Sequence, residues 1–312
     1  MIELNKIYQG DSLSILKTWP DEFVDCVITS PPYWGLRDYG VEGQLGLEKT
    51  PEEYVAKMVE IFREVKRVLK KEGTLWLNLG DSYVSAKDRY SSVPQTVSGK
   101  HRGEPIDNNR PDLKGHEYLK DKDLAGIPWR VAFALQADGF YLRQDIIWAK
   151  PNPMPESVTD RCTKSHEYVF LLTKSPKYYF DNEAIKEDSV VSDKWKEPDK
   201  KYLSKAEGNG ETSLKKGFNR MGEIGGKRNK RSVWTVTTKP FKEAHFATFP
   251  EDLIIPMVKA GCPLGGVCLD PFMGAGTTAL VAKKLSRKYI GIELNPEYIK
   301  IAENRLAQGT LL

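Results

Sequence analysis

The segment Ser30-Pro31-Pro32-Tyr33 carries groups suited to holding a planar ring that bears an amino group. Two consecutive prolines fix the backbone and leave carbonyls without neighbouring N–H donors, because proline has no amide hydrogen. A rigid row of acceptors fits an exocyclic amine, and the Tyr33 ring can stack on the ring that bears it. From these residues alone, the alternative is a proline turn with a tyrosine in the core.

A second segment, residues 269–278, has features of a cofactor-binding turn. Gly274 and Gly276 allow the backbone to approach a ligand closely, and the helix expected after them offers unpaired N–H groups at its start. The segment lacks the third glycine of G-x-G-x-x-G, because residue 279 is alanine, and it is not a Walker-type phosphate loop. Glu293 ends the next expected strand, where an acidic side chain can bind both hydroxyls of a ribose. These features predict an adenosine-bearing cofactor; the alternative is a tight turn and a solvated glutamate.

Alternating strand and helix patterns place both segments at the ends of strands. Apolar runs at 24–29 and 267–270 precede the proline pair and the glycine turn, respectively. A helix is expected from Thr50-Pro51 to near Gly73, followed by a strand at 74–79. Further strands are expected at 141–148, 166–172 and 289–293, and further helices at about 124–137, 250–260, 277–285 and 296–306. This order predicts an α/β domain with a parallel sheet and right-handed crossovers.

Two polar stretches interrupt the pattern and predict how the chain is organised. Residues 1–180 are expected to form the catalytic half of one α/β domain, with a polar loop at about 83–122. Residues 181–238 are expected to form a basic insertion, and residues 239–312 the cofactor-binding half of the same domain. The sheet would therefore combine strands from both ends of the chain.

The insertion concentrates the positive charge of the chain. Between Lys186 and Arg231 there are 13 Lys+Arg against 8 Asp+Glu, an excess larger than the net charge of +4 of the whole chain. The segment is rich in glycine, contains interleaved aromatic residues and ends in a basic run. Such a segment suits contact with a polyanion, and a solvated surface insertion fits the charge equally well.

The overall composition excludes several classes of protein. The 312 residues are 40% hydrophobic and 29% charged, which is ordinary for a soluble globular protein. No apolar run approaches the roughly 20 residues that span a bilayer, and the first residues lack the apolar stretch of a signal peptide. The four cysteines form neither a disulfide framework nor a C-x-x-C pair, so we expect no metal site. We expect a cytoplasmic protein with no membrane partner.

Taken together, the two segments resemble motifs of the S-adenosylmethionine-dependent DNA amino-methyltransferases. Ser-Pro-Pro-Tyr at 30–33 resembles the catalytic motif IV, and Asp-Pro-Phe-x-Gly-x-Gly-Thr at 270–277 resembles the cofactor motif I. Motif IV comes first, as in the β group of that family. Gln9-Gly10-Asp11 resembles motif III, and residues 245–250 resemble motif X. The resemblance covers nearly the whole chain outside the two polar stretches. It implies a Rossmann-like methyltransferase sheet with circularly permuted motif order and a target-recognition region in the basic insertion.

The resemblance implies a role for each matching residue. Ser30 and the Pro31 carbonyl would accept hydrogen bonds from the target amino group, Tyr33 would stack on the base, and Pro32 and Trp34 complete the catalytic set. The residues expected to bind S-adenosyl-L-methionine are Asp11, His245, Thr248, Asp270, Pro271, Phe272, Gly274, Gly276, Thr277 and Glu293. Those expected to bind DNA are Lys227, Arg228, Lys230 and Arg231. No metal is implied.

The implied reaction is direct in-line methyl transfer to an exocyclic amine of a flipped base, with no covalent enzyme intermediate. Serine at position 30 is typical of cytosine-N4 members, whereas adenine-N6 members mostly carry Asp or Asn. The expected target is therefore N4 of cytosine in double-stranded DNA, and N6 of adenine is the alternative. More distant alternatives are an RNA methyltransferase, which usually has the reverse motif order, and an inactive DNA-binding protein of the same fold.

The resemblance also implies protein partners. Members of the β group often form dimers, so a homodimer is expected. A cognate restriction endonuclease would be the partner of the chain in a restriction-modification system.

Overall fold

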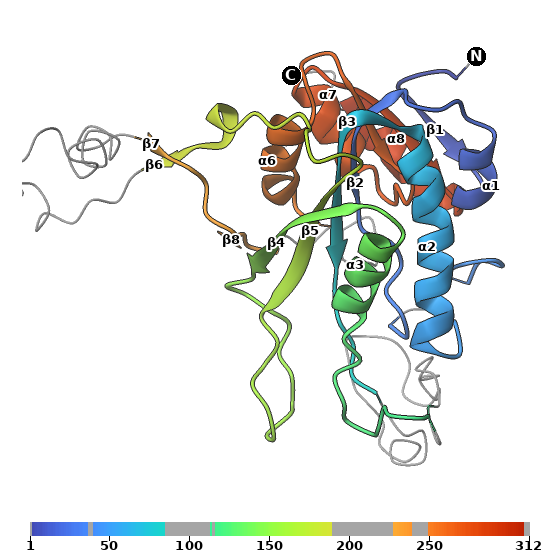
Figure 1. The fold of residues 1–312 in the computed structure, drawn as a ribbon, viewed down its shortest axis with the longest axis vertical. Helices are drawn as coiled ribbons and strands as arrows, with labels where there is room; N and C mark the ends of the chain where they lie inside the picture. The colour runs from blue at the N-terminus through green and yellow to red at the C-terminus, as the bar shows by residue number, and fades with distance from the viewer. Residues whose placement is uncertain are drawn as a thin grey trace, which may run out of the picture. The chain divides into compact units, whose positions relative to one another are not determined.

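The computed structural model describes residues 2–36, 40–84, 113, 116–188, 227–238 and 249–308. The chain divides into two compact units, one formed by Met1–Phe180 with Ser232–Leu312 and the other by Asp181–Arg231. The larger unit is built around an eight-stranded sheet with the order β1-β10-β9-β2-β3-β5-β4-β8 (Figure 1). In that order the strands are Lys6–Gln9, Lys288–Glu293, Val267–Asp270, Val24–Thr29, Leu69–Leu79, His166–Thr173, Tyr141–Ala149 and Val233–Thr235. Strands from both ends of the chain thus share one sheet.

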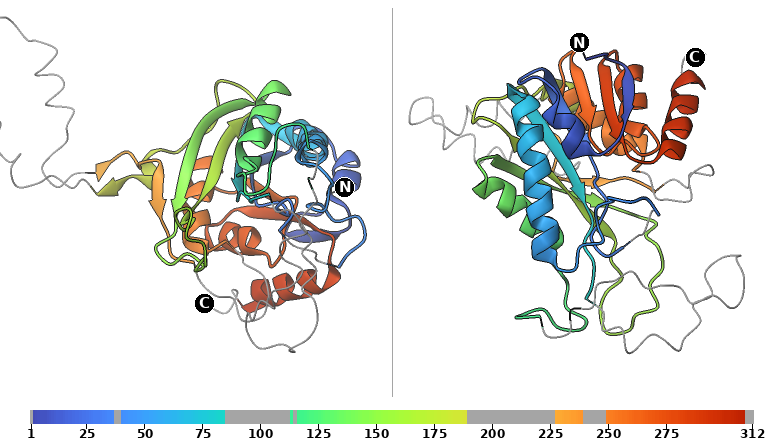
Figure 2. Two further views of the ribbon diagram at one scale, coloured as in Figure 1. Left: turned by 90° about the horizontal axis from the view of Figure 1, so that it is seen from below. Right: turned by 90° about the vertical axis from the view of Figure 1, so that its right-hand side faces the viewer.

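Helices cover both faces of this sheet (Figure 2). One face carries α1 (Ser12–Lys17), α2 (Pro51–Val68) and α3 (Ile127–Ala137). The other carries α6 (Glu251–Gly261), α7 (Thr277–Lys284) and α8 (Pro296–Gln308). The neighbouring strands β1, β10, β9, β2 and β3 are parallel to one another. Strand β5 is antiparallel to both β3 and β4. The α/β class expected from the sequence is confirmed, with one antiparallel strand in a mainly parallel sheet.

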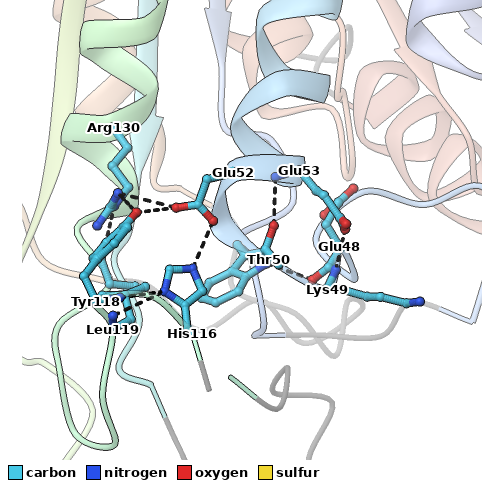
Figure 3. Close-up of polar contacts among 11 residues, drawn as sticks. Glu48, Lys49, Thr50, Glu52, Glu53, His116, Tyr118, Leu119 and Arg130 are labelled. Atoms are coloured by element: carbon cyan, nitrogen blue, oxygen red, sulfur yellow. Dashed lines mark hydrogen bonds and ion pairs between the residues drawn. The ribbon is translucent and has the colours of Figure 1, made fainter. Parts of the chain in front are cut away.

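Helix α2 begins where the sequence predicts. The Thr50 hydroxyl accepts a hydrogen bond from the Glu53 N–H at 3.2 Å, and the Glu53 carboxylate accepts one from the Lys49 N–H at 3.0 Å (Figure 3). The first bond satisfies a donor that the first helical turn leaves unpaired, and the second ties the residue before the cap to that turn. Besides Pro51 at the start of α2, its buried side chains recur at helical spacing and are Tyr54, Met58, Ile61, Phe62, Val65 and Val68.

The end of α2 differs from the prediction, which placed it near Gly73. The helix ends at Val68, and Leu69 adopts an extended conformation with φ −71° and ψ 132°. Leu69 is the first residue of β3 and pairs with Val24 of β2. Strand β3 therefore already begins at Leu69, and its register with β2 shifts before the next paired residue, Thr74. The helical spacing of the apolar residues does not reveal this early start.

Residues 116–119 attach the end of the first polar stretch to α2 and α3. His116 Nε2 lies 3.2 Å from Glu52 Oε2, and the Tyr118 hydroxyl donates to the same carboxylate (Figure 3). Arg130 of α3 donates to the Tyr118 hydroxyl at 2.6 Å. Most of the loop expected at 83–122 lies outside the described residues. The contacts of His116 and Tyr118 hold its last residues against α2 and α3.

The smaller unit ends at Arg231, before the boundary expected at 238. Val233–Thr235 forms β8 and pairs in parallel with β4, so these residues belong to the main sheet. Within the smaller unit, the two-residue strands β6 (Glu187–Asp188) and β7 (Lys227–Arg228) pair antiparallel. In the described parts of the chain, no helix is long and apolar enough to cross a bilayer.

Candidate active site

Both chemistry-bearing segments lie at one edge of the sheet. Strands β1, β10, β9, β2 and β3 are parallel, so their carboxyl ends meet at that edge. The antiparallel strand β5 begins at the same edge. The glycine turn follows β9, Glu293 ends β10, and Ser30–Tyr33 follows β2. In open α/β sheets, ligands bind outside the carboxyl ends of the strands. Both segments therefore lie where a ligand of this fold is expected.

Asp270, at the end of β9, is fully buried, and both of its carboxylate oxygens accept hydrogen bonds from the chain itself. Its Oδ1 accepts hydrogen bonds from the Thr29 hydroxyl at 2.6 Å and the Phe272 N–H at 3.0 Å. Its Oδ2 accepts one from the Thr278 hydroxyl at 2.8 Å. Burial raises the pKa of Asp270 to about 6, against the opposing effect of these hydrogen bonds. The carboxylate joins β2, the glycine turn and α7, so it shapes the turn from within.

The two glycines of the turn have different surroundings. Gly274 has φ +52°, and a Cβ added there would meet nothing closer than the Phe272 carbonyl oxygen at 4.0 Å. Gly276 has φ +79°, and a Cβ there would lie 2.7 Å from the Ala302 Cβ of α8. Both conformations favour glycine. Gly276 serves the packing of α8, whereas Gly274 leaves open space in which a ligand can approach the backbone.

Glu293 anchors the same turn from β10. Its Oε2 accepts a hydrogen bond from the Gly274 N–H at 2.7 Å, and its Oε1 accepts one from the Asn295 N–H at 2.8 Å. Burial raises the pKa of Glu293, and the two backbone bonds act in the opposite direction. Each oxygen keeps acceptor capacity, so the carboxylate can accept two further hydrogen bonds from vicinal hydroxyls. The residues present therefore fit the ribose of an adenosine-bearing cofactor.

The first loop of the chain lies beside Glu293. The Gly10 N–H donates to the Glu293 carbonyl at 2.9 Å, and Asp11, which follows, caps α1 by accepting a hydrogen bond from the Ser14 N–H at 2.8 Å. The Ser12 hydroxyl donates to the Pro271 carbonyl, which ties α1 to the glycine turn. Asp11 thus stands at the same edge as Glu293.

The remaining predicted cofactor residues occupy less direct positions or lie outside the described residues. The Thr277 hydroxyl, in the first turn of α7, accepts a hydrogen bond from Arg305 of α8 at 3.1 Å. Phe272 packs against the core. His245 and Thr248 are the two that lie outside the described residues.

The segment Ser30–Tyr33, the predicted catalytic segment, is held from two sides. The Ser30 hydroxyl donates to the Tyr33 hydroxyl at 3.1 Å, and the Pro32 carbonyl accepts a hydrogen bond from Tyr54 of α2 at 2.9 Å. The Tyr33 ring lies so close to Gly80 that a Cβ at residue 80 would come within 2.5 Å of its Cε2. The two acceptors that the sequence predicts for an amine, the Ser30 hydroxyl and the Pro31 carbonyl, belong to this segment.

Trp34 is buried in the core beside the segment Ser30–Tyr33. Its side chain is 3% exposed, and its indole N–H donates to the Glu48 carbonyl at 3.0 Å. The ring packs within the hydrophobic core beside the segment. Its observed contacts brace the loop that carries Ser30.

Three residues that no sequence motif marks contact the catalytic segment or its partners. The Tyr33 hydroxyl donates to Glu167 Oε2 at 2.8 Å, Asn78 Nδ2 donates to the same oxygen at 3.2 Å, and Lys150 pairs with the other carboxylate oxygen. Burial, followed by the nearby Glu167 charge, raises the pKa of Tyr33 well above its usual value. A glutamate at the start of the apolar strand 166–172 was the available signal.

The basic run at 227–231 is partly neutralised within its own unit. Arg228 Nε lies 3.0 Å from Glu187 Oε1, and Arg231 Nε lies 2.7 Å from the same oxygen. Lys227 and Arg228 form β7, opposite the acidic β6. Two of the four predicted DNA-binding residues therefore share one carboxylate.

Comparisons with known proteins agree with this arrangement. The Type II methyltransferase M.Cfr9I of Citrobacter freundii is 47% identical over 307 residues, which cover 98% of this chain and 89% of that protein. The structure of PvuII DNA methyltransferase (cytosine-N4-specific) is similar with a TM-score of 0.62 at 20% identity, covering 96% of this chain and 85% of that one. TTHA0409 of Thermus thermophilus, complexed with S-adenosyl-L-methionine, gives a TM-score of 0.60 at 23% identity, covering 97% and 93%. These two structures show that the fold is shared.

A family model described as DNA methylase, of the N6 and N4 methyltransferases, matches residues 24–304. The match includes the catalytic segment, the glycine turn and Glu293, and the motifs follow the order of the β group. The chain therefore belongs to the N6/N4 DNA methylase family, and S-adenosyl-L-methionine is its cofactor.

Proposed function

We propose that this DNA methylase transfers a methyl group to N4 of cytosine in double-stranded DNA. The observation that supports this choice is Ser30, whose hydroxyl donates to Tyr33 at 3.1 Å. A hydroxyl that donates its only proton there has its lone pairs left for a hydrogen bond from the target amine. Serine at this position is typical of cytosine-N4 members of the family, so the neutral acceptor favours cytosine over adenine.

The cofactor half of the site would hold S-adenosyl-L-methionine through few direct contacts. Glu293 accepts the ribose hydroxyls, Asp11 lies at the adenine end, and the backbone at Gly274 faces the methionine part. When bound, the cofactor supplies an electrophilic methyl group on a sulfonium centre. Asp270 contributes by holding the turn rather than by contact, because its side chain is fully buried and its oxygens accept hydrogen bonds from Thr29, Thr278 and the Phe272 N–H.

The catalytic half would prepare the amine for attack. An aromatic exocyclic amine is a poor nucleophile, because its lone pair is delocalised into the ring. Hydrogen bonds from the amine to Ser30 and to the Pro31 carbonyl draw the nitrogen toward a tetrahedral geometry and free that lone pair. Tyr33 stacks on the extruded base, whose removal from the duplex costs a few kcal/mol.

Nucleoside mass spectrometry tests the choice of base. Unmethylated genomic DNA is incubated with the protein and S-adenosyl-L-methionine, digested, and analysed for methylated nucleosides. We expect 4-methylcytosine. Detection of 6-methyladenine alone would overturn cytosine as the target and leave the family and the cofactor unchanged. If methylation appears only on RNA, the proposal of a DNA target fails.

The roles of the basic segment and of further protein partners also belong to this proposal. Lys227, Arg228, Lys230 and Arg231 would contact the DNA backbone and help position the target. The homodimer and the cognate restriction endonuclease stay predictions from the resemblance. Analytical ultracentrifugation with and without duplex DNA measures the first, and a monomer under both conditions would contradict it.

A further inference from the structure

A row of polar groups leads from Ser30 to a largely buried ion pair. The Ser30 hydroxyl donates to the Tyr33 hydroxyl at 3.1 Å, which donates to Glu167 Oε2 at 2.8 Å. Glu167 Oε1 pairs with Lys150 Nζ. The segments come from the end of β2, the start of β5 and the end of β4, whose strands lie in one sheet (Figure 1). The sheet therefore assembles a continuous path of hydroxyls that ends at a carboxylate.

The surroundings of Glu167 fix it in this position. Asn78 of β3 donates to Glu167 Oε2 at 3.2 Å and to the Tyr168 carbonyl at 3.0 Å. The side chains of Glu167 and Lys150 are 16% and 17% exposed, so the pair is largely buried and still reaches water. Lys164 adds a second positive charge near Glu167, and Asp81 lies beside Lys164.

Methylation of an amine requires that a proton leave the nitrogen. The amine forms its bond to the methyl carbon with its own lone pair, and the electron pair of the broken carbon–sulfur bond stays on sulfur. The nitrogen is then cationic and carries one proton too many. A nitrogen cation on an aromatic ring is a strong acid, so an ionised carboxylate can take that proton. Ser30 cannot keep it, because a protonated hydroxyl is a still stronger acid.

We propose that Glu167 is the terminal acceptor of the amine proton, reached through Ser30 and Tyr33. The amine proton moves to Ser30 Oγ while the Ser30 proton moves to Tyr33 Oη and the Tyr33 proton moves to Glu167 Oε2. Each hydroxyl ends with one proton, as it began, and Glu167 becomes a carboxylic acid that returns its proton to water. The proposal rests on the proposed function, in which Ser30 contacts the target amine.

Two further features support the direction of the relay. Burial and the nearby Glu167 charge raise the pKa of Tyr33 well above its usual value, so the phenol stays protonated at neutral pH and passes protons as a hydroxyl. The other acceptor near Tyr33 is Asn78 Oδ1 at 3.2 Å, and an amide oxygen is too weak a base to take the proton. Glu167 is the carboxylate in direct contact with the Tyr33 hydroxyl among the described residues.

The decisive variant is Glu167→Gln, which keeps an oxygen that can accept the Tyr33 hydrogen bond but cannot accept a proton. We expect the single-turnover rate of methyl transfer to fall on the order of 100-fold, a typical contribution of acid–base catalysis. The Kd for S-adenosyl-L-methionine and for DNA should stay within about twofold of wild type, since neither is contacted by Glu167 in the proposed site. Glu64→Gln is the matched control, because Glu64 pairs with Arg67 on α2 and is 20% exposed. It should leave the rate unchanged.

A double-mutant cycle with Tyr33→Phe distinguishes proton transfer through the Tyr33 hydroxyl from a role of Glu167 in positioning the Tyr33 ring. Phenylalanine keeps the ring that stacks on the base and removes the hydroxyl that passes the proton. We expect Tyr33→Phe to lower the rate as much as Glu167→Gln, and the double variant to be no slower than either, because both changes interrupt one path. Formate should partly restore the rate of Glu167→Ala, since it supplies a carboxylate in the vacated place.

Base extrusion provides a readout independent of methyl transfer. The fluorescence of 2-aminopurine at the mapped target position should rise equally with wild type and Glu167→Gln. The relay is overturned if Glu167→Gln or Tyr33→Phe keeps the wild-type rate, or if the slow variants also lose the fluorescence signal, which would make Glu167 a brace for the ring. Failure of the proposed function looks different, because wild type itself would then form no 4-methylcytosine in DNA.

Discussion

At the scale of single residues, Glu293 is the clearest test of how the cofactor is held. Glu293→Gln replaces one carboxylate oxygen with an NH2 group, which would face the N–H of Gly274 or Asn295. We expect the Kd for S-adenosyl-L-methionine to rise at least about tenfold, because hydrogen bonds to a charged group contribute roughly 1.5–3 kcal/mol. Isothermal titration calorimetry measures the change. Glu297→Gln, on the exposed side of α8, should bind as wild type, and equal loss in both variants would contradict the assignment.

Asp270 makes a prediction about stability and pH. Its folded pKa of about 6 lies above the ordinary pKa of 3.8, so the folded protein binds a proton more tightly than the unfolded chain. The resulting stability is fully present below pH 3.8 and is lost as pH rises through about 6. Relative to Asp270→Asn, the wild-type free energy of unfolding should therefore fall by on the order of 3 kcal/mol between about pH 4 and pH 7.

Urea unfolding of both proteins at several pH values measures this difference. The hydrogen bonds from Thr29 and Thr278 to residue 270 are altered in the variant at every pH, so they change the offset of the two curves and not their difference in slope. Curves that remain parallel across this pH range would show that Asp270 titrates near its ordinary value.

At the scale of elements, the turn between β9 and α7 contains one glycine that packs against α8 and another that we expect to face the cofactor. Gly276→Ala would place its Cβ 2.7 Å from Ala302 of α8, so we expect it to destabilise the fold by about 1–3 kcal/mol. Gly274→Ala meets open space and bears only the strain of φ +52°, about 1 kcal/mol, but its methyl group would occupy the approach to the ligand. We expect Gly274→Ala to bind S-adenosyl-L-methionine much more weakly while remaining nearly as stable as wild type.

Thermal unfolding without cofactor and calorimetric titration with it distinguish the two glycines. A stable Gly274→Ala variant that binds the cofactor normally would remove this turn from the proposed binding site. A Gly276→Ala variant as stable as wild type would show that α8 can move to accept the methyl group.

The elements of this fold differ in how far local sequence patterns predict them. The strand at 267–270, the glycines and the start of α7 were predictable, because apolar runs and glycine positions report local backbone geometry. The end of α2 was not, since the apolar spacing continues while the pairing of Leu69 with Val24 of β2 determines where the strand begins. Likewise, β8 is too short to be seen in the sequence and exists through its pairing with β4.

At the scale of the whole molecule, the basic segment predicts how DNA binding depends on salt. Arg228 and Arg231 face Glu187, so changing them would leave that carboxylate unpaired. The variant Lys227→Gln/Lys230→Gln leaves both of these ion pairs in place. We expect weaker DNA binding and a shallower dependence of log K on log salt, by about 0.9 for each phosphate that is no longer neutralised. Fluorescence anisotropy at several salt concentrations measures the slope.

A charge-matched variant controls for net charge. Lys6→Gln/Lys300→Gln removes two positive charges from exposed side chains of β1 and α8 and should leave the slope unchanged. If both double variants give the wild-type slope, the segment at 227–231 is a solvated surface and DNA is bound elsewhere.

The sequence by itself determined the chemistry-bearing segments, their places at strand ends, the α/β class and, by resemblance, the family and cofactor. Each of these depends on residues close together in the chain, whose types restrict the local backbone and leave a readable pattern. Even the convergence of the two segments followed from the rule that parallel strands end at one edge of the sheet.

Only the tertiary structure decided which distant side chains contact the two chemistry-bearing segments. Thr29 meets Asp270, and Tyr33 meets Glu167, across separations of 241 and 134 residues, because β2 lies beside β9 and because β3 brings β5 to the same edge. No local pattern reports strand order or register, so the sequence could place Ser30 and Tyr33 but not the carboxylate proposed to receive their proton.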